Sequence, residues 1–146
     1  MAVITLNEVF NIFSRERYSN RISQKVTALI ETLNESGIVK IEDQEYTVYP
    51  KNLFREDTDI DLIFFSKKEV LVCKINDNDD VAVQLFTSEK INKIELQKLN
   101  TNNQTVELFI HITNEEPIHL SNVEDTNVNW SRKFYGLILD IYNVLK

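Results

Sequence analysis

The chain has 146 residues, of which 42% are hydrophobic and 27% charged, and its formal net charge is −7. This composition predicts one globular domain over residues 1–146 and excludes a largely disordered chain. Because bare nucleic acid and anionic bilayers attract clustered lysine and arginine, the acidic balance argues against either as the main partner, and we expect no direct binding to nucleic acid.

The first part of the chain is predicted to form a pair of helices. Thr5 and Glu8 have the spacing of a capping box, in which each side chain accepts the other residue's backbone amide. A second helix follows, and Gly37 suits the left-handed conformation that ends many helices. The apolar residues of this second helix recur at the spacing of one helix face: Ile22, Val26, Leu29, Ile30 and Leu33.

Two hairpins are predicted next. The short runs 38–41 and 45–49 form the first, which Pro50 closes. Segments 60–65 and 70–75 are strongly apolar and form the second. Strands buried on both faces lack polar alternation, so these two arms are expected in the centre of a sheet.

Further strands are expected towards the C-terminal half. A turn over 76–80 leads to a strand at 81–86, and the following segment 91–96 suits either a strand or a helix. A polar turn precedes the strand 105–112, and 118–120 is a brief final strand. The apolar side chains of segment 105–112 alternate and are expected to point inward: Val106, Leu108, Ile110 and Ile112.

The chain is predicted to end in an amphipathic helix. Ser121 and Glu124 again have capping-box spacing, and an apolar stripe follows: Trp130, Phe134, Leu137, Ile138, Ile141 and Leu145. The predicted organisation is α+β, with a helical extension over 1–37, antiparallel strands over 38–121 and a C-terminal helix over 122–146.

From about Asp59 onward, this order of antiparallel strands and one closing helix resembles the pleckstrin-homology-like (PH-like) superfold, particularly its small bacterial versions. The segments that carry the resemblance are 60–75, 81–99, 106–120 and 130–145. It implies a strongly bent sheet or partial barrel that the last helix plugs, and a binding module rather than an enzyme. The N-terminal helical pair is an addition to that pattern.

Some members of that family bind phosphoinositides through a basic first hairpin. Here the turn 66–69 supplies two lysines beside a glutamate. This departure disfavours lipid binding and leaves peptide binding or scaffolding as what the resemblance implies.

One segment combines aromatic and basic residues. Tyr46, Tyr49 and Phe54 lie close in sequence to Lys51 and Arg55, which makes these five residues the candidate partner-binding or base-stacking surface. The alternative, which we favour, is that the N-terminal helices pack on the sheet here.

Two groups of acidic residues are candidate cation ligands. On an extended backbone Asp57, Asp59 and Asp61 would point to one side and could hold a hard cation. A solvated acidic lead into a strand is the preferred alternative, because no glycine-containing loop is near. The cluster 77–80 lacks the glycine and spaced glutamate of an EF-hand and is predicted to be a hairpin turn.

His111 and His119 are expected on the outer face of neighbouring strands. Two histidines with a nearby glutamate suit zinc binding or proton exchange, although polar positions on a sheet face are the preferred interpretation. Cys73 lies in an apolar run and is predicted to be a buried structural thiol rather than a nucleophile. With only two glycines, the chain lacks the usual phosphate-loop and dinucleotide motifs, and we predict no cofactor.

The expected location is the cytoplasm of a bacterium. The lone Cys73 excludes an intramolecular disulfide and favours a reducing compartment. The start of the chain lacks the features of a signal peptide, and no apolar run approaches the length needed for membrane insertion. An abundance of Asn, Lys and Ile favours a low-GC bacterium or one of its phages as the source.

Three functions compete at this point. The leading hypothesis is a non-enzymatic protein-interaction or scaffolding domain that binds a protein partner or a second copy of itself. The first alternative is a phage-encoded inhibitor that occupies a surface of a host protein. The second alternative is a metal-dependent enzyme that uses the aspartates or histidines.

Overall fold

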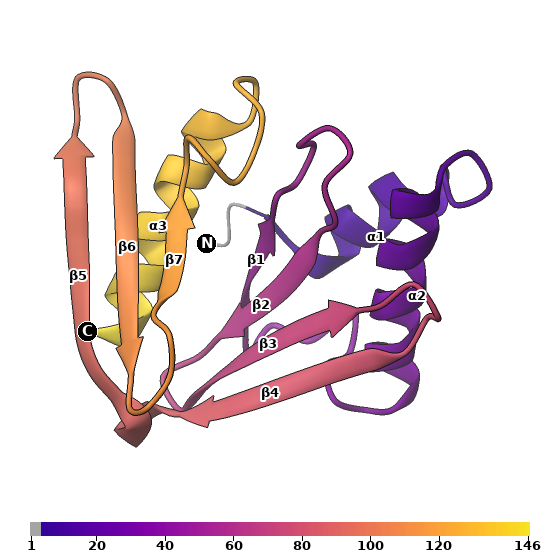
Figure 1. Ribbon diagram of the computed structural model, residues 1–146, viewed down its shortest axis with the longest axis horizontal. Coiled ribbons are helices and arrows are strands. Elements are labelled where there is room, and N and C mark those ends of the chain that lie inside the picture. Colours follow the sequence, from indigo (N-terminus) through magenta and orange to yellow (C-terminus); the bar gives the residue numbers. More distant parts are fainter. Residues whose placement is uncertain (1–3) are drawn as a thin grey trace.

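The computed structural model describes residues 4–146, and these residues form three α-helices and seven strands in two antiparallel sheets (Figure 1). The helices are α1 (Leu6–Ser14), α2 (Arg21–Glu35) and α3 (Ser131–Leu145). The strands are β1 (Thr47–Lys51), β2 (Asp61–Phe65), β3 (Glu69–Ile75), β4 (Val81–Thr87), β5 (Ile91–Asn100), β6 (Thr105–Ile112) and β7 (Ile118–Ser121), with a 3-10 turn, η1 (Ser88–Lys90), between β4 and β5.

The N-terminal helices have the predicted ends. The capping box at the start of α1 is confirmed: the Glu8 amide donates to Thr5 Oγ1 at 3.1 Å, and the Thr5 amide donates to Glu8 Oε1 at 3.3 Å. After α2, Gly37 adopts a φ of 78°, as expected for a residue that ends a helix in the left-handed region. The apolar face of α2 is buried from Val26 to Leu33 and contacts β3.

The predicted hairpin between 38–41 and 45–49 is wrong. Residues 38–41 form a turn that folds back on the end of α2, where the Ile41 amide donates to Asn34 Oδ1 at 2.9 Å. β1 instead pairs with β2, and Pro50 lies within β1 opposite Leu62. A proline is tolerated here because β1 is an edge strand, and one side of an edge strand needs no ladder amide.

The first sheet has the order β1-β2-β3-β4 and contains the predicted second hairpin as β2 and β3. Every residue of β2 after Asp61 is buried. Successive side chains of a strand point to opposite faces, so both faces of β2 are covered. Cys73 of β3 has no exposed surface, as predicted for a structural thiol, and its burial raises the pKa of the thiol to about 12.

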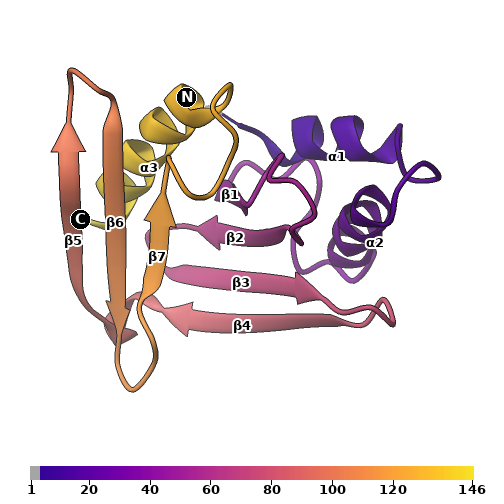
Figure 2. The same cartoon turned by 45° about the horizontal axis from the view of Figure 1, so that its top comes forward.

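The second sheet has the order β5-β6-β7, and the ambiguous segment 91–96 is a strand within β5. The predicted inward side chains of β6, Val106, Leu108, Ile110 and Ile112, are all buried. Figure 2 shows that the strands of this sheet run across those of the first sheet.

The C-terminal helix begins at Ser131, later than the expected residue 122. Ser121 Oγ does accept the amides of Val123 and Glu124, but these bonds form a turn. Tertiary contacts hold the next residues out of a helix, since the Thr126 hydroxyl donates to the Leu53 carbonyl at 2.7 Å. The residues that follow Ser131 behave as predicted, because four apolar side chains of α3 are fully buried: Phe134, Leu137, Ile138 and Ile141.

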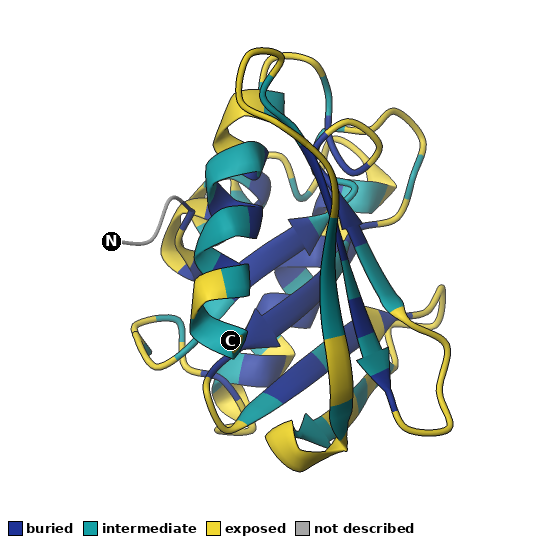
Figure 3. Cartoon of the chain, turned by 90° about the vertical axis from the view of Figure 1, so that its left-hand side faces the viewer, coloured by how far each residue is buried: buried dark blue, intermediate teal, exposed yellow. Residues whose placement is uncertain are grey.

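α3 contacts β2 of the first sheet and β6 and β7 of the second, so it closes the space between the two sheets (Figures 1 and 3). Buried side chains from all three helices and both sheets form one hydrophobic cluster. Two antiparallel sheets closed by a C-terminal helix are the α+β, PH-like architecture that the sequence predicts. Within residues 4–146, no helix is both long and apolar enough to cross a bilayer.

Candidate functional site

The predicted partner-binding segment is largely used inside the protein. Tyr49 has no exposed surface. Its hydroxyl donates to Asp125 Oδ2 at 2.6 Å, and its ring packs edge-on against Phe134. Burial, together with the Asp125 carboxylate, raises the pKa of Tyr49 well above its usual value. Tyr49 therefore joins β1 to the turn after β7 and is not available to a partner.

The other members of the segment differ in exposure. Lys51 donates to Asp125 Oδ1 at 2.9 Å and to the His119 carbonyl at 2.7 Å. Phe54, which lies in the turn after β1, stacks on Phe13 of α1 and packs against Trp130. Tyr46 lies just before β1 and is partly buried, and its hydroxyl donates to the Glu69 carboxylate. Arg55 is exposed.

The three alternating aspartates do not share one extended backbone. Asp57 has a φ of 54°, so the chain turns there. Asp59 accepts a hydrogen bond from Lys25 at 3.0 Å, whereas Asp61 lies 3.8 Å from Lys74. The sequence did not indicate the role of Lys25, which is buried in α2 and reaches Asp59 and Asp77 from the helix.

The outer face of the second sheet carries both histidines, as predicted. His111 Nε2 lies 2.6 Å from Glu95 Oε1, and His119 Nε2 lies 2.6 Å from Glu107 Oε1. Phe109 lies opposite His119 in the register, and the two rings stack with centroids 4.5 Å apart. Each histidine therefore binds a different glutamate.

The charges on this face are internally compensated. A hydrogen bond from Lys98 to Glu107 at 3.0 Å lowers the pKa of Glu107, and contact with His119 lowers it further. The hydrogen bond between His111 and Glu95 likewise lowers the pKa of Glu95. Both carboxylates are thus stabilised as anions.

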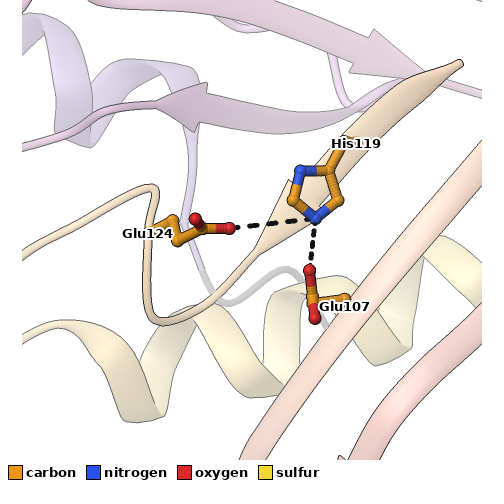
Figure 4. A group of neighbouring side chains, drawn as sticks. All are labelled: Glu107, His119 and Glu124. Carbon is orange, nitrogen blue, oxygen red and sulfur yellow. Dashed lines mark hydrogen bonds and ion pairs between the residues drawn. The ribbon is translucent and has the colours of Figure 1, made fainter.

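Glu124 adds a second carboxylate beside His119, at 4.0 Å from Nε2 (Figure 4). It lies in the turn after β7, whereas Glu107 lies on β6. Glu124 was not among the sequence candidates, because its position beside His119 depends on where the turn after β7 folds.

A surface groove of about 1440 Å³ lies between the start of α1, the segment 39–48 and the end of α3. Its charged lining residues are Lys40, Glu42, Asp43 and Asp140. Three carboxylates against one ammonium group give the groove a negative charge, which disfavours phosphate-bearing ligands. The lysines of the turn 66–69 do not line it.

The two sheets have four edges, and natural proteins protect exposed edges with proline, charge, bulges or short strands. β1 contains Pro50, and β7 has only four residues. β5 carries three charged residues and two register shifts. β4 has seven residues, no charge, no proline and an uninterrupted register with β3. Among the strands of residues 4–146, β4 is the edge that lacks these protections.

A family model described as a protein of unknown function (DUF3908) matches residues 6–136. The chain belongs to this family. None of the curated proteins matches this DUF3908 member.

Among solved structures, it is similar to a DUF1696 family protein with a pleckstrin-homology domain from Shewanella loihica PV-4. The identity is 16% and the TM-score is 0.43, over 81% of this chain and 93% of the other.

Proposed function

We propose that this DUF3908 member is a non-enzymatic protein-interaction domain that binds an extended segment of a partner protein along the free edge of β4. The observation that carries the proposal is the missing protection of that edge. An added strand would hydrogen-bond to backbone groups of β4, which is a common mode of peptide recognition.

The side chains of β4 suit this role. The chain has a net charge of −7, but none of the seven residues of β4 is charged. Leu85 is 53% exposed, and Ala82 and Gln84 are also exposed. An incoming strand would therefore meet apolar and neutral side chains without burying an unpaired charge.

Two groups of side chains support a non-enzymatic role, the Cys73 thiol and the cluster of Tyr49, Lys51 and Asp125. Cys73 is buried, and its raised pKa keeps the thiol protonated, whereas nucleophilic attack requires the thiolate. Tyr49, Lys51 and Asp125 bind one another between β1 and the turn after β7. These hydrogen bonds stabilise the fold, and the polar atoms that form them are already paired within the protein.

Site-specific photo-crosslinking tests the proposal. A photoreactive residue is placed at Gln84 on β4 or, as a matched control, at Gln97 on β5, and cells that make the protein are irradiated. Both positions are exposed glutamines on edge strands. We expect a discrete crosslinked protein from position 84 and none from position 97.

A substitution in β4 then tests whether the crosslink depends on a partner strand bound along this edge. Leu85→Lys places a charge on the edge and is expected to remove the crosslinked product without unfolding the protein. A product of twice the chain mass would identify the partner as a second copy. Equal products from positions 84 and 97, or none from position 84, would refute the proposal.

A further inference from the structure

We propose that Glu107, His119 and Glu124 form a binding site for a divalent transition-metal ion of the zinc class (Figure 4). Each residue offers one ligand atom, and these atoms all lie within 4.8 Å of one another. The site draws on β6, β7 and the turn that follows β7. It is separate from the β4 edge and does not depend on the proposed function.

The distances suit such an ion. His119 Nε2 lies 2.6 Å from Glu107 Oε1 and 4.0 Å from Glu124 Oε2. Zinc binds histidine nitrogen and carboxylate oxygen at about 2.1 Å, so two of its ligands are roughly 3.4 Å apart in a tetrahedral site. The two observed distances lie on either side of that value, so metal binding requires His119 and Glu107 to move apart and His119 and Glu124 to approach each other.

The ligand types select the class of ion. Ca²⁺ and Mg²⁺ prefer oxygen ligands throughout, whereas imidazole suits zinc and its neighbours in the first transition row. Three protein ligands leave one position of a tetrahedral ion for water.

Neighbouring groups hold the ligands in place. The ring of His119 stacks on Phe109 with an interplanar angle of 18°. Ser121 Oγ accepts the Glu124 amide at 3.1 Å and thereby shapes the turn that carries this glutamate.

Lys98 orients Glu107 by binding the carboxylate oxygen that does not face His119. It binds Glu107 Oε2 at 3.0 Å, while Glu107 Oε1 faces His119. A hydrogen-bond partner on the second oxygen of a ligating carboxylate is a usual part of a metal site.

The same sheet face contains a matched control. His111 and Glu95 lie 2.6 Å apart, as His119 and Glu107 do, and Lys93 lies 3.5 Å from Glu95. In the part of the chain that the structure describes, no third carboxylate, imidazole or thiol joins this pair to make a metal-binding group.

The test uses tag-free, full-length protein freed of metal with a chelator. Zn²⁺ binding is measured by calorimetry in competition with a chelator of known affinity, and Co²⁺ binding is followed by visible absorption. We expect one ion per chain and a Co²⁺ spectrum of low coordination number. His119→Gln should abolish this binding, and Glu124→Gln should weaken it by at least about tenfold.

The control variant His111→Gln should bind Zn²⁺ like the wild type. Circular dichroism of each variant checks that it is folded, and the exposed Glu124 makes Glu124→Gln the safest variant in this respect. Absence of stoichiometric binding, unchanged binding in a folded His119→Gln or Glu124→Gln variant, or equal loss in His111→Gln would overturn the proposal.

Discussion

In the β1–β4 sheet every residue of β2 after Asp61 is buried, whereas in the β5–β7 sheet the residues of β6 from Leu108 onward alternate between buried and partly exposed. The first sheet has α2 against β3 and α3 against β2. The second sheet has α3 on one side, and its other face carries Glu95, Glu107 and both histidines. Figure 3 shows this difference in burial.

This difference in burial predicts which side chains contribute most to the free energy of unfolding. Side chains of β2, which is covered on both faces, supply apolar burial, which is the main favourable term in folding. Glu95, His111 and His119 on the open face are partly exposed, and substitutions of such partly exposed side chains lower the free energy of unfolding less than substitutions in the core. Stability is therefore expected to depend more on the buried side chains of β2 than on the side chains of the open face of β6.

The largest expected effect tests this prediction directly. Phe64→Ala in β2 removes a side chain that is 1% exposed and is expected to lower the free energy of unfolding by about 3 to 5 kcal/mol. Phe109→Ala on the open face of β6 is the matched change and should cost well under half as much, because Phe109 is only partly buried. Urea denaturation measures both, and equal losses would contradict the prediction.

The next largest effect concerns Asp125, whose hydrogen bonds link β1 of the first sheet to β7 of the second. Asp125 is buried and accepts hydrogen bonds from Tyr49, Lys51 and the Ser121 amide. Asp125→Ala leaves the buried Tyr49 hydroxyl with only its longer bond of 3.4 Å to the Ser121 carbonyl and should destabilise the protein by about 3 kcal/mol. The control Asp61→Ala removes a longer ion pair with an exposed lysine and should cost less than about 1 kcal/mol. Thermal unfolding of both variants checks the order, which a larger loss for Asp61→Ala would reverse.

The smallest expected effect concerns Lys25 of α2, the helix that packs against β3. Lys25→Met keeps the apolar stem of a buried lysine and removes its ion pairs with two exposed aspartates, so stability at pH 7 should change by less than about 1 kcal/mol. The hydrogen bond from Lys25 lowers the pKa of Asp77 below 3.8, and the same contact raises the pKa of Lys25 above 10.5.

These two pKa shifts give the pH dependence its sign. The Asp77 contribution is present above its unfolded pKa of 3.8 and is lost as the pH falls through the lower folded value. The Lys25 contribution is fully present below 10.5 and is lost only at still higher pH. Relative to the wild type, Lys25→Met should gain stability as the pH falls below about 4. Urea midpoints at neutral and acid pH test this, and a pH-independent difference would contradict it.

Several features could be predicted because they depend on residues close together in the chain. The capping box of Thr5 and Glu8 and the left-handed Gly37 are local. The apolar runs of β2 and β3 indicated the two central strands of the first sheet, and the alternation of β6 indicated one open face. Other predictions failed where distant groups compete for the backbone. Residues 38–41 have the β-branched composition of a strand, but the Asn34 side chain binds the Ile41 amide.

The sequence by itself determined the amphipathic part of each helix and the strands β2, β3 and β6, since these follow from the periodicity of neighbouring side chains. Only the tertiary structure decided that Tyr49 is buried against Asp125, that β4 is left as the unprotected edge, and that Glu124 joins His119. Contacts such as that between Tyr49 and Asp125, 76 positions apart, form only when both sheets and α3 have packed together. Their geometry is a property of the whole core and not of any one segment.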